Sequence, residues 1–132
     1  SDVMADVLER TVGLAERAAQ LGVDPSRIMI DPGHDFGKNT RHSLEVTRRL
    51  HEMTATGWPV LVAMSNKDFL GEALDLELGD RLEATLAVTT IAAWLGARVV
   101  RTHAVRPARR VLDTVRAVRG DAEPRISRRG LA

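Results

Sequence analysis

Cysteine is absent from this 132-residue sequence, and aromatic residues make up only 3% of it, with no tyrosine. The lack of cysteine excludes disulfides, thiolate nucleophiles and cysteine-ligated zinc. So few aromatic side chains argue against a platform that stacks single-stranded nucleic acid. No apolar run approaches the roughly 18 residues of a membrane span. The segment Ser1–Met4 lacks the basic start of a signal peptide. We therefore expect a cytoplasmic protein that binds neither nucleic acid nor membranes.

The charged residues nearly cancel, because 19 lysines and arginines oppose 18 aspartates and glutamates. A dedicated nucleic-acid binder usually has a larger basic excess. Hydrophobic residues make up 44% and charged residues 28% of the chain, as in an ordinary globular protein. The length predicts one domain, residues 1–132, with a basic tail at residues 120–132. Serine at position 1 suggests a trimmed tag or a chain that starts inside a longer protein.

Apolar residues alternate between helical spacing and short continuous runs. Helical spacing predicts helices over residues 2–21, 41–56 and 80–95, and a last helix whose first turn contains Pro107. Asp2 is the expected N-cap of the first helix and Gly22 its expected end. The expected apolar stripes include Leu14 on the first helix and Val115 and Val118 on the last. Continuous apolar runs predict strands near residues 27–30, 59–64 and 97–102. A loop or short turn is expected after Lys67, to about residue 79. This alternation indicates right-handed βαβ crossovers and a parallel sheet.

Three parallel strands leave two open sheet edges, which indicates a piece of a larger βα structure. The C-terminal half of a TIM (β/α)8 barrel fits best, because a whole barrel needs about 200–250 residues. The alternative is a complete flavodoxin-like sheet, but this fold would need about five strands. The open edges also predict a homo-oligomer, strand exchange, or pairing with a missing N-terminal half.

Polar side chains follow each of the three predicted strands. Asp31 ends the first, Ser65 and Lys67 end the second, and Arg101 and His103 end the third. The carboxyl ends of parallel strands meet at one rim, where ligands bind in such folds. Lys67, Arg101 and His103 therefore predict a site for phosphate, sulfate or diphosphate. The carboxylate of Asp31 could accept paired N–H bonds from a nitrogen heterocycle.

Simpler interpretations exist for each of these residues taken alone. An aspartate before Pro-Gly, such as Asp31, is often only a turn former, and the cationic side chains could be solvated. The coincidence of three polar strand ends favours a site instead. A metal centre is not expected, because no recognised ligand spacing relates His34, Asp35, His42 and His51.

Four segments, in chain order, resemble the C-terminal half of dihydropteroate synthases. Residues 30–39 resemble the family's D-P-G-x-x-F-G-K segment, and residues 62–67 its G-x-S-R-K segment. Residues 81–87 resemble the E-R-L-x-G-T/S-L-A helix, and residues 96–103 the G-A-x-x-x-R-V-H-D segment. The resemblance covers about residues 27–119 and extends to the opening helix.

The resemblance implies a TIM barrel whose members join the pterin of a dihydropterin diphosphate to p-aminobenzoate and release diphosphate. In that site Asp31 and Lys67 would hold the pterin ring. Arg101 and His103 would hold the diphosphate, and Arg101 would also stack on the pterin. Cationic and N–H partners suit a leaving group on which negative charge builds.

The resemblance also places p-aminobenzoate, with Ser65 near its carboxylate and Phe36 near its ring. Magnesium is expected in the full-length family, bound by an asparagine in the missing N-terminal half. No cofactor is therefore expected in this chain.

Departures from the family pattern favour a divergent second-copy branch, whose members are thought to lack the synthase reaction. Asn66 replaces an arginine, Ala104 replaces an aspartate, and Asp68 adds a negative charge beside the lysine. His34 and Asp35 stand where the family has a small, apolar pair. Without the N-terminal half, this chain alone should not be a competent synthase.

Three hypotheses follow from the sequence. The chain is the C-terminal half of a synthase, an inactive homologue that binds a pterin-like or phosphorylated ligand, or a half-barrel that acts only by assembly. Asn66 and Ala104 favour the second hypothesis over the first. The intact strand-end residues argue against the third.

Overall fold

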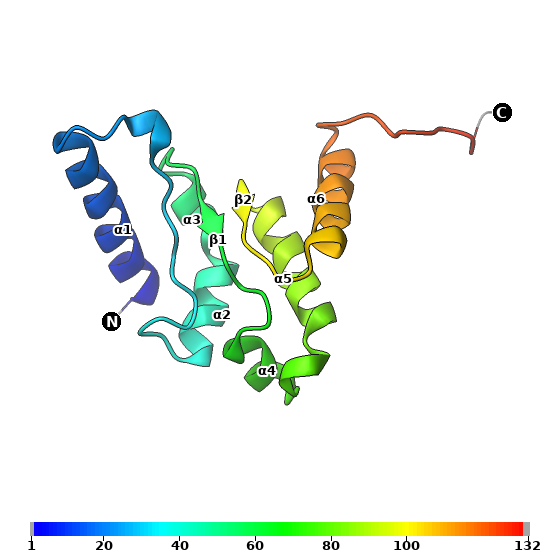
Figure 1. Ribbon diagram of the computed structural model, residues 1–132, viewed down its shortest axis with the longest axis horizontal. Coiled ribbons are helices and arrows are strands. Elements are labelled where there is room, and N and C mark those ends of the chain that lie inside the picture. The colour runs from blue at the N-terminus through cyan, green and yellow to red at the C-terminus, as the bar shows by residue number, and fades with distance from the viewer. Residues whose placement is uncertain (1, 131–132) are drawn as a thin grey trace.

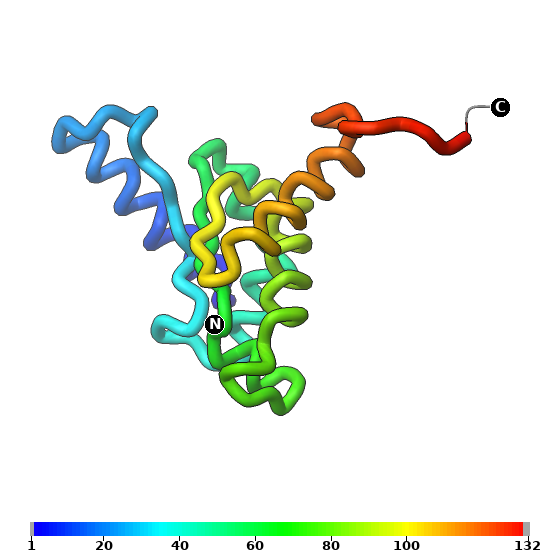
Figure 2. Tube along the Cα trace, turned by 45° about the vertical axis from the view of Figure 1, so that its right-hand side comes forward, coloured from blue at the N-terminus to red at the C-terminus, as the bar shows by residue number. Residues whose placement is uncertain are grey.

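The computed structural model describes residues 2–130 and shows helices packed around a narrow layer of parallel extended segments (Figure 1). In chain order the elements are α1 (Val3–Gln20), η1 (Pro25–Arg27), α2 (Thr40–Arg48), α3 (Leu50–Thr54), β1 (Leu61–Val62), α4 (Asp68–Leu74), η2 (Leu78–Asp80), α5 (Leu82–Trp94), β2 (Val99–Val100) and α6 (Val105–Arg119). Helices α1 and α6 lie at opposite ends of the molecule, with the strands, α2 and α5 between them (Figures 1 and 2).

The strands run parallel, as predicted, but they are short. β1 pairs with β2 in the register Leu61 to Val99. On the other side of β1, Ile30 forms an isolated parallel bridge with Val60. The three extended segments therefore lie in chain order. The prediction of a strand over residues 27–30 is wrong in extent, because the 3-10 turn η1 occupies residues 25–27 and only Ile30 is paired.

Helix α1 begins and ends at residues that the sequence identifies. The carboxylate of Asp2 accepts the backbone N–H groups of Met4 and Ala5, at 3.0 and 3.2 Å, which caps the first turn. At the other end Gly22 has a φ of +104°, a left-handed conformation that favours glycine. The predicted stripe on α1 is only partly buried, since Leu14 lies exposed.

The predicted helix over residues 41–56 is interrupted at Arg49, which separates α2 from α3. The guanidinium of Arg49 forms ion pairs with three carboxylates, on Asp2 at 2.8 Å, Glu45 at 2.9 Å and Glu52 at 2.6 Å. These bonds raise the pKa of the Arg49 guanidinium, with the bond to Glu52 contributing most. Arg49 thus connects the ends of three helices.

The prediction of a loop or short turn up to about residue 79 is wrong in part, because this segment contains α4. This helix is anchored by Phe69 and Leu70, which are buried against the core. Helix α5 covers the predicted region and packs on α6. On α6 the predicted stripe is again incomplete, since Val115 is buried whereas Val118 is exposed.

One core cluster joins the helices to the strand layer. Its fully buried members come from α1, α2, α3, the strand region, α4 and α5, and they include Met4, Val46, Leu50, Met53, Val62, Phe69 and Ala92. Among the described residues, no helix is long and apolar enough to cross a membrane.

Candidate functional site

A cleft of about 320 Å³ opens at the carboxyl ends of β1 and β2. Its lining consists of Ala63, Ser65, Lys67, Arg101, Thr102 and His103. Four of the six residues predicted for a site, two from each strand end, are therefore brought together. We call this the rim cleft.

Ser65 and His103 form two hydrogen bonds with each other across the rim cleft. The hydroxyl oxygen of Ser65 accepts the backbone N–H of His103 at 3.1 Å and lies 2.9 Å from the Nδ1 atom of its ring. The hydroxyl proton can then be donated to Nδ1, which leaves the proton of a neutral ring on Nε2. In this arrangement His103 offers an N–H donor to a ligand without carrying a charge.

Lys67 lies beside the loop that follows Ile30. Its ammonium donates to the backbone carbonyl of His34 at 2.8 Å and lies 4.8 Å from the centre of the Phe36 ring. Burial lowers the pKa of the ammonium below its ordinary value, and the nearby Arg101 lowers it further. The negative charges of Asp31 and Asp35 oppose this decrease in the pKa.

Asp31 and Phe36 do not line the rim cleft. The Asp31 carboxylate is exposed and accepts the backbone N–H of Gly33 at 2.8 Å, which is the turn-forming arrangement. The Phe36 side chain is 71% exposed and lies over Lys67. Both residues are at the border of the cleft, beside the lysine.

Asn66 stands where the resemblance expects a cation, and its side chain turns toward α5. It has a φ of +57°, its backbone N–H donates to the Thr85 hydroxyl at 3.0 Å, and that hydroxyl donates to the Asn66 amide oxygen at 3.4 Å. Asparagine tolerates this left-handed conformation better than most residues do. Asn66 itself therefore brings no positive charge to this point.

Arg81 holds the segment that carries Lys67 in place. No role for Arg81 was predicted from the sequence. Its guanidinium donates to the carbonyl of Asn66 at 2.8 Å and to the carboxylate of Asp68 at 3.0 Å. A Cβ atom at Gly71 would collide with this guanidinium. Both contacts join residues more than ten positions apart, so no local pattern predicts them. The one sequence signal was that Arg81 belongs to residues 81–87, which resemble a helix of the family.

His34 lies in a buried polar network beneath the loop. Its side chain is 1% exposed, its ring stacks on Phe69 at 5.4 Å, and its Nε2 atom lies 2.9 Å from the Thr47 hydroxyl. That hydroxyl donates to the carbonyl of Ser43 at 2.8 Å, so it accepts from Nε2. Burial lowers the pKa of His34 to about 3, and the charge of Lys67 acts in the same direction. The ring is therefore neutral near pH 7.

Asp35 connects the same loop to α2 and α4. Its backbone N–H donates to the Ser43 hydroxyl at 3.1 Å, and its carboxylate accepts the backbone N–H of Phe69 at 3.3 Å. The pair His34 and Asp35 thus fixes the loop whose carbonyl holds Lys67. From the sequence, this pair was identified only as a departure from the family and as two groups without metal-ligand spacing.

The metal prediction concerns clusters of His, Asp and Glu side chains. Within residues 2–130, no three side chains of His, Asp or Glu converge as a metal would require. Lysine, arginine and histidine surround the rim cleft, and a hard cation prefers carboxylate and carbonyl oxygens. Magnesium binding by the other half of a full-length relative stays a prediction.

Known proteins with a similar sequence include both dihydropteroate synthases and relatives named as inactive. A family described as "Pterin binding enzyme" matches residues 1–103. "Inactive dihydropteroate synthase 2" of Mycobacterium leprae is 48% identical over 130 residues, which is 98% of this chain and 45% of that protein. "Dihydropteroate synthase" of Escherichia coli is 36% identical over 118 residues, or 89% of this chain and 40% of that protein. The chain thus spans less than half the length of these relatives.

Solved structures with a similar fold carry the same name. The Yersinia pestis dihydropteroate synthase in a sulfonamide drug complex superposes with a TM-score of 0.87 at 30% identity, covering 92% of this chain and 44% of that one. The Thermus thermophilus dihydropteroate synthase superposes with a TM-score of 0.84 at 38% identity, covering 90% of this chain and 47% of that one. These similarities confirm the prediction of part of a TIM barrel over the flavodoxin-like alternative.

Proposed function

Because this chain belongs to the family of pterin-binding enzymes that includes the dihydropteroate synthases, we propose that it supplies the half of a synthase-type site that binds a dihydropterin diphosphate. The observation that carries the proposal is the rim cleft. Its Ser65, Lys67, Arg101 and His103 come from two strand ends and face one space. In a full-length protein this half would serve the transfer of the pterin to p-aminobenzoate.

The cationic side of the rim cleft suits the diphosphate. When the amine nitrogen of p-aminobenzoate forms a bond to the carbon that carries the diphosphate, the C–O bond breaks and its electron pair leaves with the diphosphate oxygen, while the nitrogen loses a proton. Arg101 can meet two of the oxygens with paired N–H groups, and Nε2–H of His103 can donate to a third. Such preorganised donors stabilise the developing charge more than the ground state.

The residues at the border of the rim cleft would contact the pterin and the ring of p-aminobenzoate. Asp31 would accept N–H groups of the pterin, and Lys67 would donate to its acceptor atoms. The exposed ring of Phe36 is available to the ring of p-aminobenzoate. Ser65 would lie near the p-aminobenzoate carboxylate, although its hydroxyl already bonds His103.

Calorimetric titration of diphosphate tests this assignment. Replacing Arg101 by alanine should weaken diphosphate binding at least tenfold, because each charge-assisted bond contributes about 1.5–3 kcal/mol. Binding by the wild type should also weaken as salt rises, since the site lies at the surface. Arg110→Ala is the control, because Arg110 is an exposed arginine of α6 outside the rim cleft. Equal affinity in wild type and Arg101→Ala would refute the proposal.

A second candidate is ligand binding without the synthase reaction. It is favoured by the Asn66 side chain, which turns toward Thr85 and leaves the cleft without the family's additional cation. The name of the Mycobacterium leprae relative points the same way. Complementation of a synthase-deficient strain by the full-length gene distinguishes the candidates. Diphosphate binding that depends on Arg101 without complementation would favour the second.

Assembly is a separate prediction about the open edges of the strand layer. Ile30 is paired on the side of Val60, and β2 on the side of β1, so each offers its other edge to a partner. We expect homo-oligomers or pairing with an N-terminal half. Light scattering over a wide concentration range checks this, and a stable monomer throughout would contradict it.

A further inference from the structure

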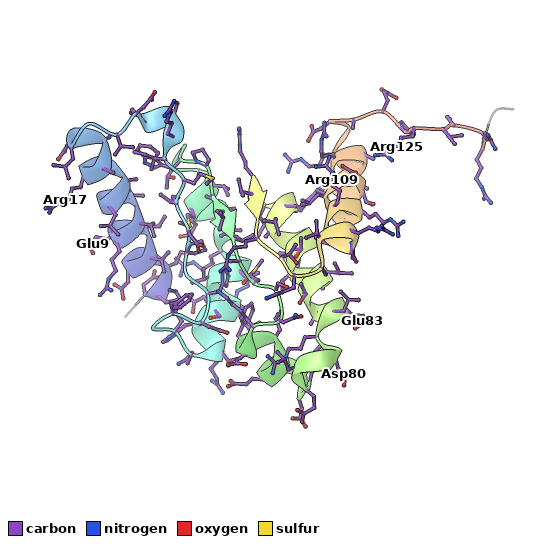
Figure 3. All side chains as sticks on the ribbon, in the orientation of Figure 1. Glu9, Arg17, Asp80, Glu83, Arg109 and Arg125 are labelled. Carbon is purple, nitrogen blue, oxygen red and sulfur yellow. The ribbon has the colours of Figure 1, made fainter. Side chains whose placement is uncertain are left out.

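The near-zero net charge of the chain conceals two oppositely charged regions. Residues 98–132 contain ten arginines and three acidic residues, whereas residues 1–97 contain nine basic and fifteen acidic residues. Figure 3 shows this separation, with Arg109 and Arg125 at one end of the molecule and Asp80 and Glu83 at another. Every basic residue of the C-terminal region is arginine, the side chain whose planar fork fits phosphate oxygens.

A second cleft, of about 390 Å³, lies within this basic region. It is bordered by the end of α5, the turn that leads into β2, and α6. Its charged lining consists of Arg98, Arg109, Arg116, Arg119, Asp113 and Asp121. Arg98 precedes β2 and Arg101 follows it, so this arginine cleft lies at the opposite strand end from the rim cleft.

Two of the four arginines are neutralised by the two aspartates. Arg109 pairs with Asp113 at 2.9 Å, and Arg119 pairs with Asp121 at 3.2 Å. Arg119 is also held by the backbone carbonyl of Trp94, to which it donates at 2.8 Å. These contacts fix the orientation of the Arg109 and Arg119 guanidinium groups in the free protein.

The other two arginines, Arg98 and Arg116, have no carboxylate partner within residues 2–130. Both side chains are exposed. The lining of the arginine cleft therefore carries two uncompensated positive charges. A phosphate monoester or inorganic phosphate carries about two negative charges near pH 7 and offers three or more acceptor oxygens. A carboxylate would neutralise only one of the two guanidinium groups.

We propose that the arginine cleft is a second anion site, which binds a phosphate group. The ligand is either free phosphate or the phosphate end of a larger metabolite, and both would be recognised through paired N–H donors of Arg98 and Arg116. This site is separate from the rim cleft and does not depend on the function proposed for it.

The test is a titration of inorganic phosphate followed by calorimetry and by amide NMR shifts. The amides of residues 96–98 and 113–121 should shift on binding. The double variant Arg98→Gln/Arg116→Gln should bind phosphate at least tenfold more weakly at these amides. The matched control Arg106→Gln/Arg110→Gln removes the same charge from α6 outside the cleft and should stay within about twofold of wild type. A sugar phosphate or mononucleotide that binds more tightly than phosphate would identify the larger ligand.

Three outcomes would overturn the proposal. The first is unchanged phosphate binding in Arg98→Gln/Arg116→Gln. The second is an equal loss in both double variants. The third is tight binding of a short DNA duplex that both double variants weaken alike, since this would show a diffuse polyanion surface. Arg101→Gln should leave the shifts at the arginine cleft in place, so failure of the rim-cleft function and failure of this site are distinguishable.

Discussion

Replacement of Phe69 by alanine is expected to lower the free energy of unfolding by about 3–5 kcal/mol. The side chain is 0% exposed in the core that joins α4 to the strand layer. It also stacks on the ring of His34. Truncation removes this apolar surface from the core and leaves a cavity that the surrounding helices can fill only partly. Urea unfolding monitored by circular dichroism measures the change.

Phe36→Ala is a matched control, because the chain has two phenylalanines and this one is 71% exposed. Its ring forms a cation–π interaction with Lys67, which contributes about 0.5–1 kcal/mol at an exposed site. We therefore expect a change of at most about 1 kcal/mol. Similar losses in the two variants would show that Phe69 does not occupy the core position described here.

Acid should destabilise the chain through His34, beginning as the pH falls below about 6.5. In the folded state burial lowers the pKa of His34 to about 3 from its ordinary value of 6.5. Between these values the unfolded chain binds a proton that the folded chain does not, so stability falls with pH by about 1.4 kcal/mol per unit. At pH 5 the loss should reach about 2 kcal/mol, and it is absent above pH 7.

The variant His34→Phe separates this effect from the titration of carboxylates. It keeps an aromatic ring against Phe69 and removes the titrating group, so the loss of stability between pH 7 and 5 should shrink by about 2 kcal/mol. His51→Gln is the control, since it removes an exposed histidine of α3 and leaves the buried network intact. If His34→Phe and wild type lose stability equally over this range, the His34 explanation is wrong.

The sequence was most informative where local chemistry decides structure. The cap at Asp2 predicts the start of α1, and the alternation of apolar patterns predicts the parallel layer. Ser65, Lys67, Arg101 and His103 were predicted to share a site because strand ends in such folds meet at one rim, and one cleft contains all four. The roles assigned to them stay predictions.

Long-range contacts explain what the sequence did not reveal. At the break, Arg49 pairs with Asp2, 47 residues away, and the apolar stripe continues across it, so no local pattern marks the position. Helix α4 has only seven residues, too few for a helical period to emerge, and it depends on Phe69 for its position. The segment before Ile30 pairs at a single bridge, and a strand requires neighbours that no local pattern reveals.

The left-handed backbone at Asn66 explains why asparagine suits this position, where the resemblance expects an arginine. A φ of +57° costs most L-residues about 1–2 kcal/mol, and asparagine adopts this conformation more readily than most residues do. Its amide oxygen accepts the hydroxyl of Thr85 on α5. An arginine on the same backbone would carry the full cost of the left-handed conformation. Asparagine therefore keeps the carbonyl of residue 66 in the orientation that Arg81 bonds, at a lower conformational cost.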